Sequence, residues 1–232
     1  HRGLHDNKGD FPENSLGSFA LAVKKGYGME FDLQLSKDGK IVVFHDSSLK
    51  RMSGLDLKVA DLTYDELKEI KLLNSKEIIP LFDDLLKLVD GKTPLIVELK
   101  AEDKNIDSLC RKVSEKLDSY KGLYCVESFN PFVVAWFKKN RPNYIRGQLS
   151  SKDLAGDILP INKGLLANLM LNFISRPDFI AYDHNYRDAL VFNLINKLWN
   201  PPTVSYTVKN QDDFNKNKKY FDLQIFEGFE PK

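Results

Sequence analysis

The chain has 232 residues, 42% of them hydrophobic and 29% charged, a composition typical of a globular protein and not of a disordered or fibrous one. Its 34 basic and 33 acidic residues leave a formal net charge of +1, so no bulk attraction to nucleic acid or to an anionic membrane is expected. No apolar run is long enough to span a bilayer. Any phosphate recognition must therefore come from a local site.

Along the whole chain, short strand-like runs of apolar or alternating residues are followed by helical patterns. The predicted strands are Met29–Leu35, Leu95–Lys100, Leu123–Phe129, Tyr144–Leu149, Phe179–Asp183, Thr203–Val208 and Asp222–Glu227. A first strand, truncated at the N-terminus, is expected to end at His1. The predicted helices are Asn14–Lys25, Tyr64–Leu72, Leu81–Val89, Asn105–Leu117, Pro131–Lys139, Leu165–Ile174, Ala189–Trp199 and Asp212–Lys219.

The alternation of strands and helices implies parallel pairing. Eight such units in 232 residues favour a closed (β/α)8 TIM barrel over an open doubly wound sheet. Because no Gly/Ser-rich linker or abrupt change of composition interrupts the chain, residues 1–232 are predicted to form a single barrel domain. The sequence does not indicate an oligomeric state.

The chain begins at His1 and not at Met, so a removed signal or anchor upstream stays open. The expected location is the cytoplasm. The two cysteines, Cys110 and Cys125, have no CxxC spacing and are predicted to be two buried thiols, not a disulfide or a zinc site.

Polar residues stand at the carboxyl ends of the predicted strands. In a barrel of this kind, functional groups gather at that end, where all eight strands open into one mouth. The residues concerned are His1-Arg2, Glu30, Asp32, Glu98, Lys100, Glu127-Ser128, Gln148, Asp183, Tyr206-Thr207 and Glu227. Strands often end in polar residues at solvent, but the coincidence at several strands indicates a site.

The strand Met29–Leu35 carries two acids on one face. Side chains alternate along a strand, so Glu30 and Asp32 share one face while the apolar residues between them share the other. Inward-facing carboxylates are costly unless they are paired or bind a metal. Mg²⁺ or Ca²⁺ is the natural partner for oxygen ligands. A solvent-exposed acidic face is the less favoured interpretation.

The segment Ser36–Gly39 contains Asp-Gly, a strong hairpin signal, and predicts a short β-hairpin arm after the second barrel strand. A loop at Asp38-Gly39 would place Asp32 opposite His45, and a loop at Lys37-Asp38 would place Glu30 there. Either register brings His45 beside the two acids.

Two further segments carry candidates. Glu98 and Lys100 share a strand face, so Glu98 is suited to complete a cation site and Lys100 to neutralise a phosphate oxygen; an ordinary ion pair is the alternative. His1 titrates near neutrality, and the planar fork of Arg2 suits phosphate oxygens.

The segment Pro12–Ser15, which follows the His1-Arg2-Gly3 motif, has simpler interpretations. Asn14 is interpreted as a cap for the helix after it, and Glu13 as a surface residue.

Together these segments resemble the glycerophosphodiester phosphodiesterase family, over ordered motifs in the first 100 residues. The motifs are His1-Arg2-Gly3, Pro12-Glu13-Asn14-Ser15, Glu30-Phe31-Asp32, Lys37-Asp38-Gly39, Val42-Val43-Phe44-His45-Asp46, Arg51-Met52-Ser53-Gly54, Ile79-Pro80-Leu81 and Glu98-Leu99-Lys100. Ser128-Phe129 and Tyr206-Thr207-Val208 are similar to later elements of the family. Tyr206 stands where the family has Trp, and Glu227 lies where many members have Asp, which weakens inference about the pocket for the alcohol.

The resemblance implies a barrel fold and hydrolysis of glycerophosphodiesters to sn-glycerol 3-phosphate and a free alcohol. It implies a divalent cation, Mg²⁺ or Ca²⁺, held by Glu30, Asp32 and Glu98. It also implies His1 and His45 as acid and base in an order that stays open. Arg2 and Lys100 are placed by it against the phosphate of a small-molecule substrate. The nucleophile is either water or the neighbouring glycerol hydroxyl.

Three other functions remain as alternatives. One is a phospholipase-D-like phosphodiesterase on the same barrel, acting on lysophospholipid or sphingomyelin. The second is a non-catalytic barrel that binds phosphoesters. The third is a metal-dependent amidohydrolase, which usually collects more than the four histidines present. His5 and His184 are assigned surface or packing roles. Candidates for lining the alcohol pocket are Phe129, Gln148, Asp183, Tyr206 and Glu227.

Overall fold

A computed structural model describes residues 1–101, 104–152 and 172–232. The chain divides into two compact units, His1–Lys100 with Asp107–Tyr124, and Ala101–Ile106 with Cys125–Lys232. Each unit is described by itself. The expectation of one domain over residues 1–232 stays a prediction.

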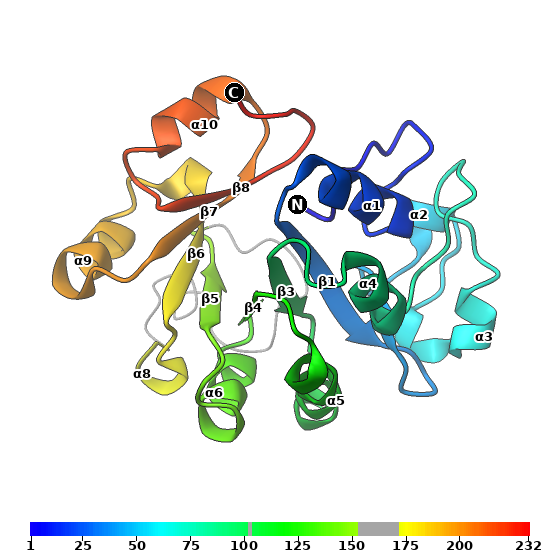
Figure 1. The fold of residues 1–232 in the computed structure, drawn as a ribbon. Coiled ribbons are helices and arrows are strands. Elements are labelled where there is room, and N and C mark those ends of the chain that lie inside the picture. The colour runs from blue at the N-terminus through cyan, green and yellow to red at the C-terminus, as the bar shows by residue number, and fades with distance from the viewer. Residues whose placement is uncertain (102–103, 153–171) are drawn as a thin grey trace. The chain divides into compact units, whose positions relative to one another are not determined.

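The first unit contains a small sheet flanked by helices (Figure 1). Strand β1 (Met29–Leu35) pairs in parallel with β3 (Leu95–Leu99) and antiparallel with β2 (Ile41–Val43). The helices are α1 (Leu16–Lys25), α2 (Lys50–Ser53), the 3-10 turn η1 (Val59–Asp61), α3 (Tyr64–Leu67), α4 (Phe82–Val89) and α5 (Ile106–Ser119), whose first residue belongs to the second unit.

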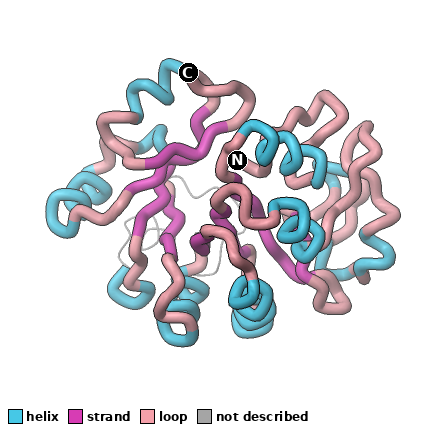
Figure 2. Tube along the Cα trace, in the orientation of Figure 1, coloured by secondary structure: helices cyan, strands magenta, loops and turns pink. Residues whose placement is uncertain are grey.

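The second unit repeats a strand followed by a helix, and its strands lie side by side in Figure 2. All neighbouring strand pairs from β4 to β8 are parallel. The strands are β4 (Tyr124–Ser128), β5 (Arg146–Ser150), β6 (Phe179–Asp183), β7 (Thr203–Val208) and β8 (Leu223–Phe226). The helical segments are α6 (Pro131–Asn140), α8 (Asn172–Ser175), η2 (His184–Tyr186), α9 (Leu190–Trp199) and α10 (Gln211–Asn217).

The predicted elements agree closely with these bounds. The strands over 29–35, 179–183 and 203–208 are confirmed to the residue, and the others differ at their ends by one or two residues. Most of the helix predicted over 165–174 lies outside the described residues. Its last three residues fall in α8. The helix predicted over 64–72 stops after one turn, because the chain bends back into a bridge between Lys71 and Ile78.

Positions 1 and 2 belong to no strand among the described residues, and the expectation of a truncated strand that ends at His1 stays a prediction. Arg2 has φ 53°, a left-handed conformation that strands do not use, so no strand continues past His1. The parallel strands are therefore β1 and β3 in the first unit and β4 to β8 in the second.

The hairpin arm is confirmed, but both predicted registers are wrong. Leu33 pairs with Val43 and Leu35 with Ile41, which corresponds to a three-residue loop at 37–39. The loop is fixed by contacts that periodicity does not reveal: the Ser36 hydroxyl donates to Asp38 Oδ1 at 2.6 Å and accepts from the Lys40 backbone N–H at 3.0 Å. Gly39, with φ 73°, supplies the left-handed residue that such loops need.

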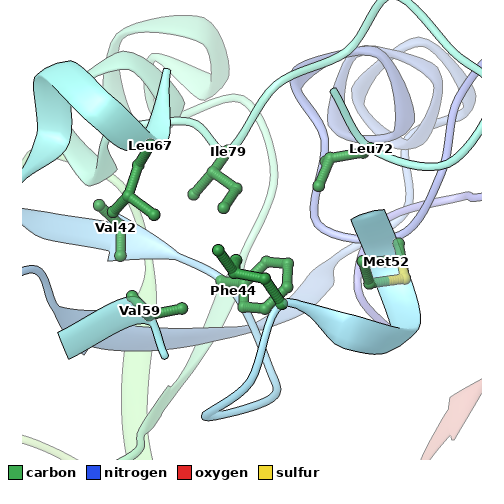
Figure 3. Close-up of a cluster of buried hydrophobic side chains, with 8 residues drawn as sticks. Val42, Phe44, Met52, Val59, Leu67, Leu72 and Ile79 are labelled. Carbon is green, nitrogen blue, oxygen red and sulfur yellow. The ribbon is translucent and has the colours of Figure 1, made fainter. Parts of the chain in front are cut away.

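The core of the first unit has two parts. Phe31 of β1 is fully buried, with Phe19 of α1 and Phe82 of α4 at ring-centroid distances of 5.8 and 5.9 Å. A second cluster lies beside β2 and is drawn in Figure 3. It consists of Val42, Phe44, Leu49, Met52, Val59, Leu67, Leu72 and Ile79. The apolar faces of β1 and β2 thus anchor the sheet and leave the polar face of β1 for other use.

Replacing Phe44 by alanine is expected to lower the free energy of unfolding by about 3–5 kcal/mol, because the ring is 2% exposed and its removal leaves a cavity in this cluster. Urea unfolding followed by circular dichroism measures the loss. Phe132→Ala, at a position that is 42% exposed, is the matched control and should cost much less. Equal losses for the two variants would contradict the described packing.

Candidate active site

Three buried carboxylates meet at the polar face of β1 and β3. Glu30 and Asp32 alternate with apolar residues along β1, and Asp32 lies beside Glu98 in the parallel register. The three residues are 4%, 1% and 6% exposed. One ligand atom from each lies within 4.8 Å of the others, so a single ion could contact all three.

Asp32 is the most heavily contacted of the three. Lys100 Nζ lies 3.2 Å from its Oδ1 and 2.7 Å from Glu98 Oε1. Arg2 Nε lies 3.3 Å from its Oδ2, and Asn14 Nδ2 donates to the same oxygen at 2.9 Å. Burial alone would raise the pKa of Asp32, but the charges of Lys100, His45 and Arg2 outweigh it and hold the pKa well below its usual range.

The other two acids are under-neutralised. Burial, then repulsion from Asp32 and Glu98, raises the pKa of Glu30 to about 8. Burial raises the pKa of Glu98 to about 7, with Lys100 opposing the rise and Asp32 adding to it. The cations around the trio therefore do not balance its charge.

This charge excess is what a divalent cation would relieve. Asp32 Oδ1 is buried and, in spite of the nearby Lys100 nitrogen, receives no hydrogen bond of acceptable geometry. Carboxylate oxygens are the ligands that Mg²⁺ and Ca²⁺ prefer. The residues present therefore fit a hard divalent cation.

His1 and Arg2 are brought to the trio by the segment ahead of α1. His1 Nε2 lies 3.7 Å from Glu30 Oε2, and the Arg2 backbone N–H donates to that same oxygen at 3.3 Å. Gly3 follows with φ 80°, and a side chain there would overlap Ser18 Oγ. Glycine thus lets the His-Arg-Gly segment lie against the start of α1.

His45 follows β2, and its Nδ1 lies 2.5 Å from Asp46 Oδ1. The prediction that Asp32 or Glu30 lies opposite His45 in the hairpin is wrong. Asp32 instead lies opposite Phe44, whose backbone N–H donates to the Asp32 carbonyl. The charge of His45 nevertheless lowers the pKa of Asp32. Buried Gln34 donates to the carbonyls of Phe44 and Asp46 at 2.8 and 2.9 Å and so holds the segment that carries His45.

Glu13 and Asn14 belong to the neighbourhood of the acidic trio and not to the surface or the helix cap. Ser15, and not Asn14, caps α1 by accepting from Ser18 N. Asn14 instead contacts Asp32, as described above. Glu13 is not a surface residue, since it is 5% exposed and is bound by Arg2 and by Arg51. The sequence offered one indication of these roles, because Glu13 and Asn14 lie in one of the family motifs and Arg51 lies in another.

Stability should fall in acid through Glu13. Burial raises its pKa, but hydrogen bonds and charge from Arg51, Arg2 and Asn7 outweigh burial and lower the pKa from 4.5 to about 2. A depressed carboxyl pKa contributes stability above the unfolded pKa, and that stability is lost as pH falls from about 4.5 through 2. The loss is about 3 kcal/mol once the pH is below the folded pKa, and about 2 kcal/mol of it occurs between pH 6 and pH 3.

Urea unfolding at pH 6 and pH 3 measures this dependence in the wild-type protein and in Glu13→Gln. The variant should lack the Glu13 share of the acid loss. Identical pH dependence in both proteins would contradict the assignment.

The candidates for the alcohol pocket lie in the second unit. Phe129 and Tyr206 pack edge to face with centroids 6.0 Å apart, and the Tyr206 hydroxyl donates to Ser150 O at 2.7 Å. Gln148 Nε2 donates to the carbonyl of Phe129 at 3.1 Å. Asp183 Oδ2 accepts from Ser151 Oγ at 3.2 Å, and Glu227 pairs with Lys209 at 3.0 Å.

His184 and the two cysteines lie outside the acidic trio and its contacts. His184 is 5% exposed, with Nε2 3.2 Å from Thr207 O, which is a packing role as predicted. Cys110 is buried and Cys125 half-buried, and both are free thiols. Among the described residues, no helix is long and apolar enough to cross a membrane.

A parallel α/β architecture with a buried acidic cluster at the strand ends is typical of barrel enzymes that bind a divalent cation. A model of the glycerophosphoryl diester phosphodiesterase family matches residues 1–223. The chain belongs to this family.

Several proteins of known sequence or structure are similar to the chain. A glycerophosphodiester phosphodiesterase of Bacillus altitudinis is 33% identical over 154 residues, 62% of each chain. Lysophospholipase D GDPD1 of Mus musculus is 28% identical over 218 residues, 88% of this chain and 64% of that protein. The chain thus spans less than two thirds of the length of these relatives.

Solved structures resemble the chain in fold. A phosphodiesterase of Oleispira antarctica, in complex with the product sn-glycerol-3-phosphate, matches with a TM-score of 0.79 at 22% identity, over 97% of this chain and 90% of that one. A glycerophosphodiester phosphodiesterase of Thermotoga maritima gives 0.73 at 23% identity, over 97% and 92%. The predicted (β/α)8 TIM barrel fold is confirmed.

Proposed function

We propose that the chain hydrolyses glycerophosphodiesters to sn-glycerol 3-phosphate and a free alcohol, with a divalent cation bound by Glu30, Asp32 and Glu98. The observation that carries the proposal is the buried acidic trio, whose oxygens lie within 4.8 Å of one another and whose charge its neighbours leave unbalanced. The product named for the Oleispira antarctica structure supports the same substrate class.

The residues around the trio suit the reaction of an anionic phosphodiester. A bound divalent cation supplies Lewis-acid stabilisation of charge on a phosphate oxygen. Arg2 and Lys100 add fixed positive charge on the same side, as their contacts with Asp32 indicate. They would orient the phosphate and offset the charge that develops on it.

His1 and His45 are the proposed acid and base. One takes the proton from the attacking hydroxyl, a P–O bond forms, and the bond to the alcohol breaks. The other gives its proton to the departing alkoxide oxygen. The attacking hydroxyl belongs to water or to the neighbouring glycerol carbon; the second route forms a cyclic phosphate that water then opens.

A substrate panel tests the proposal. Glycerophosphocholine, glycerophosphoethanolamine and glycerophosphoglycerol are assayed for sn-glycerol 3-phosphate with Mg²⁺, with Ca²⁺ and with a chelator. We expect turnover with at least one cation and none with the chelator. Binding of these compounds by calorimetry without any product would instead support the non-catalytic barrel.

A lysophospholipase-D-like activity is the second candidate. The observation in its favour is the similarity to the mouse protein of that name over 88% of this chain. Comparing turnover of lysophosphatidylcholine with that of glycerophosphocholine separates the two. A higher kcat/KM for the lysophospholipid would favour the second candidate.

A further inference from the structure

The Glu13 carboxylate lies at the centre of a set of charge-assisted hydrogen bonds. Its Oε1 accepts from Arg2 Nη1 and from Arg51 Nη2, each at 2.7 Å. Its Oε2 accepts from Arg51 Nη1 at 2.8 Å and from Asn7 Nδ2 at 2.7 Å. Both oxygens are thus shared between partners, and the group is 5% exposed. Glu13 and Arg51 form the bidentate arrangement that fixes the guanidinium plane.

Arg51 extends the set to His45. Its Nε donates to Asp46 Oδ2 at 2.7 Å and its Nη2 to Asp46 Oδ1 at 3.0 Å. The same Oδ1 lies 2.5 Å from His45 Nδ1. An ionised carboxylate can only accept, so the proton of this bond belongs to His45 Nδ1. The other ring nitrogen, Nε2, is then the one left to exchange a proton with a substrate.

We propose that Glu13 is a positioning residue that fixes the position of the Arg2 guanidinium and the orientation of the His45 ring. This inference rests on the proposed phosphodiesterase function. One arm runs from Glu13 directly to Arg2, beside Asp32. The other runs through Arg51 and Asp46 to the ring of His45. One buried carboxylate thereby couples the placement of the phosphate-binding guanidinium to the orientation of the imidazole.

Exposure explains why the coupling is needed. The Arg51 side chain is 45% exposed and the His45 side chain 33%, so neither is held by surrounding packing alone. Glu13 is the buried end of the arm, and its position is fixed by the Asn7 side chain, which donates to Oε2, and by the bond from Glu13 N to Asn7 Oδ1 at 2.8 Å. The orientation of His45 thus depends on Glu13 through two bidentate contacts of Arg51, one with Glu13 and one with Asp46.

The geometry distinguishes this role from simple charge balance. Arg51 uses three nitrogens on two carboxylates, a pattern that lysine cannot reproduce with one ammonium group. Arg51→Lys keeps the charge and removes the fork. If positioning matters, the lysine variant should be impaired nearly as much as Glu13→Gln.

Steady-state kinetics on glycerophosphocholine with the preferred cation provide the first test. Glu13→Gln should lower kcat about 10- to 100-fold and raise KM severalfold, because both arms lose their anchor. Arg51→Lys should lower kcat by at least about 10-fold with a smaller change in KM. Asp83→Asn is the matched control, since that carboxylate forms an exposed ion pair with Lys116 elsewhere in the unit, and it should leave both constants unchanged. Full activity of Arg51→Lys overturns the proposal.

A double-mutant cycle with Asp46→Asn separates the arms. In the Asp46→Asn background the His45 arm is already cut, so Glu13→Gln should lower kcat by less than about 3-fold further, yet still raise KM through Arg2. A merely structural role of Glu13 would lower kcat by the same factor in both backgrounds. That additive result overturns the proposal.

Nitrogen NMR of the imidazoles gives a readout independent of turnover. The wild-type protein should hold His45 with its proton on Nδ1, the signal being assigned with His45→Ala, and Glu13→Gln and Arg51→Lys should shift the ring toward a mixture with the Nε2–H form. An unchanged tautomer in both folded variants overturns the inference. Absence of wild-type turnover with a tautomer that depends on Glu13 would instead contradict the proposed function alone.

Discussion

His45→Ala is expected to lower kcat on glycerophosphocholine by about 10²- to 10⁴-fold while the protein stays folded, because a positioned acid or base contributes that much. His1→Ala should lose a similar factor. Loss of either imidazole removes one of two proton transfers that occur in the same displacement. The double variant should therefore lose much less than the product of the two single losses. Steady-state kinetics of the three variants measure these effects.

The pH profiles assign the two roles. The wild-type protein should give a bell-shaped dependence of kcat/KM on pH, and each single variant should lose one limb. The variant that loses the acidic limb identifies the base. His184→Gln is the matched control, because His184 is a buried imidazole with a packing contact to Thr207 O, and its kcat should be unchanged. Wild-type turnover in either alanine variant would exclude the histidine pair.

Much of the fold was predictable because one periodicity dominates each element. Met29–Leu35 alternates strictly, and its burial on both faces left little freedom in where it begins or ends. The meeting of Glu30, Asp32 and Glu98 follows from the same alternation, given parallel neighbours in register. Adjacent strands then bring adjacent polar positions together without any further information.

The errors share a different cause. The hairpin register depends on a hydroxyl, Ser36 Oγ, which binds Asp38 and Lys40 and adds one residue to the loop. The roles of Glu13 and Arg51 depend on an ion pair between residues 38 positions apart. Side-chain hydrogen bonds of this kind follow from tertiary structure, and neither composition nor periodicity encodes them.

Cutting the acidic trio should remove cation binding and activity together. Asp32→Asn is expected to lower kcat/KM by roughly 10³-fold, since several kcal/mol of transition-state stabilisation by the cation would be lost. Asp32 is chosen among the three acids because its neighbours hold its pKa below the usual range, whereas burial raises the pKa of Glu30 and of Glu98. Asp56→Asn, at an exposed ion pair with Lys50, is the matched control and should behave as wild type.

Cation binding can be measured without substrate. A cation that binds only the folded chain raises its melting temperature, so Mg²⁺ or Ca²⁺ should stabilise the wild-type protein and Asp56→Asn but not Asp32→Asn. Calorimetry should give one site per chain in the first two proteins. The trio explains the direction of this effect, because three buried carboxylates repel one another until a divalent charge lies between them. Full turnover after exhaustive chelation would show that the reaction needs no cation. The three acids would then have a structural role only.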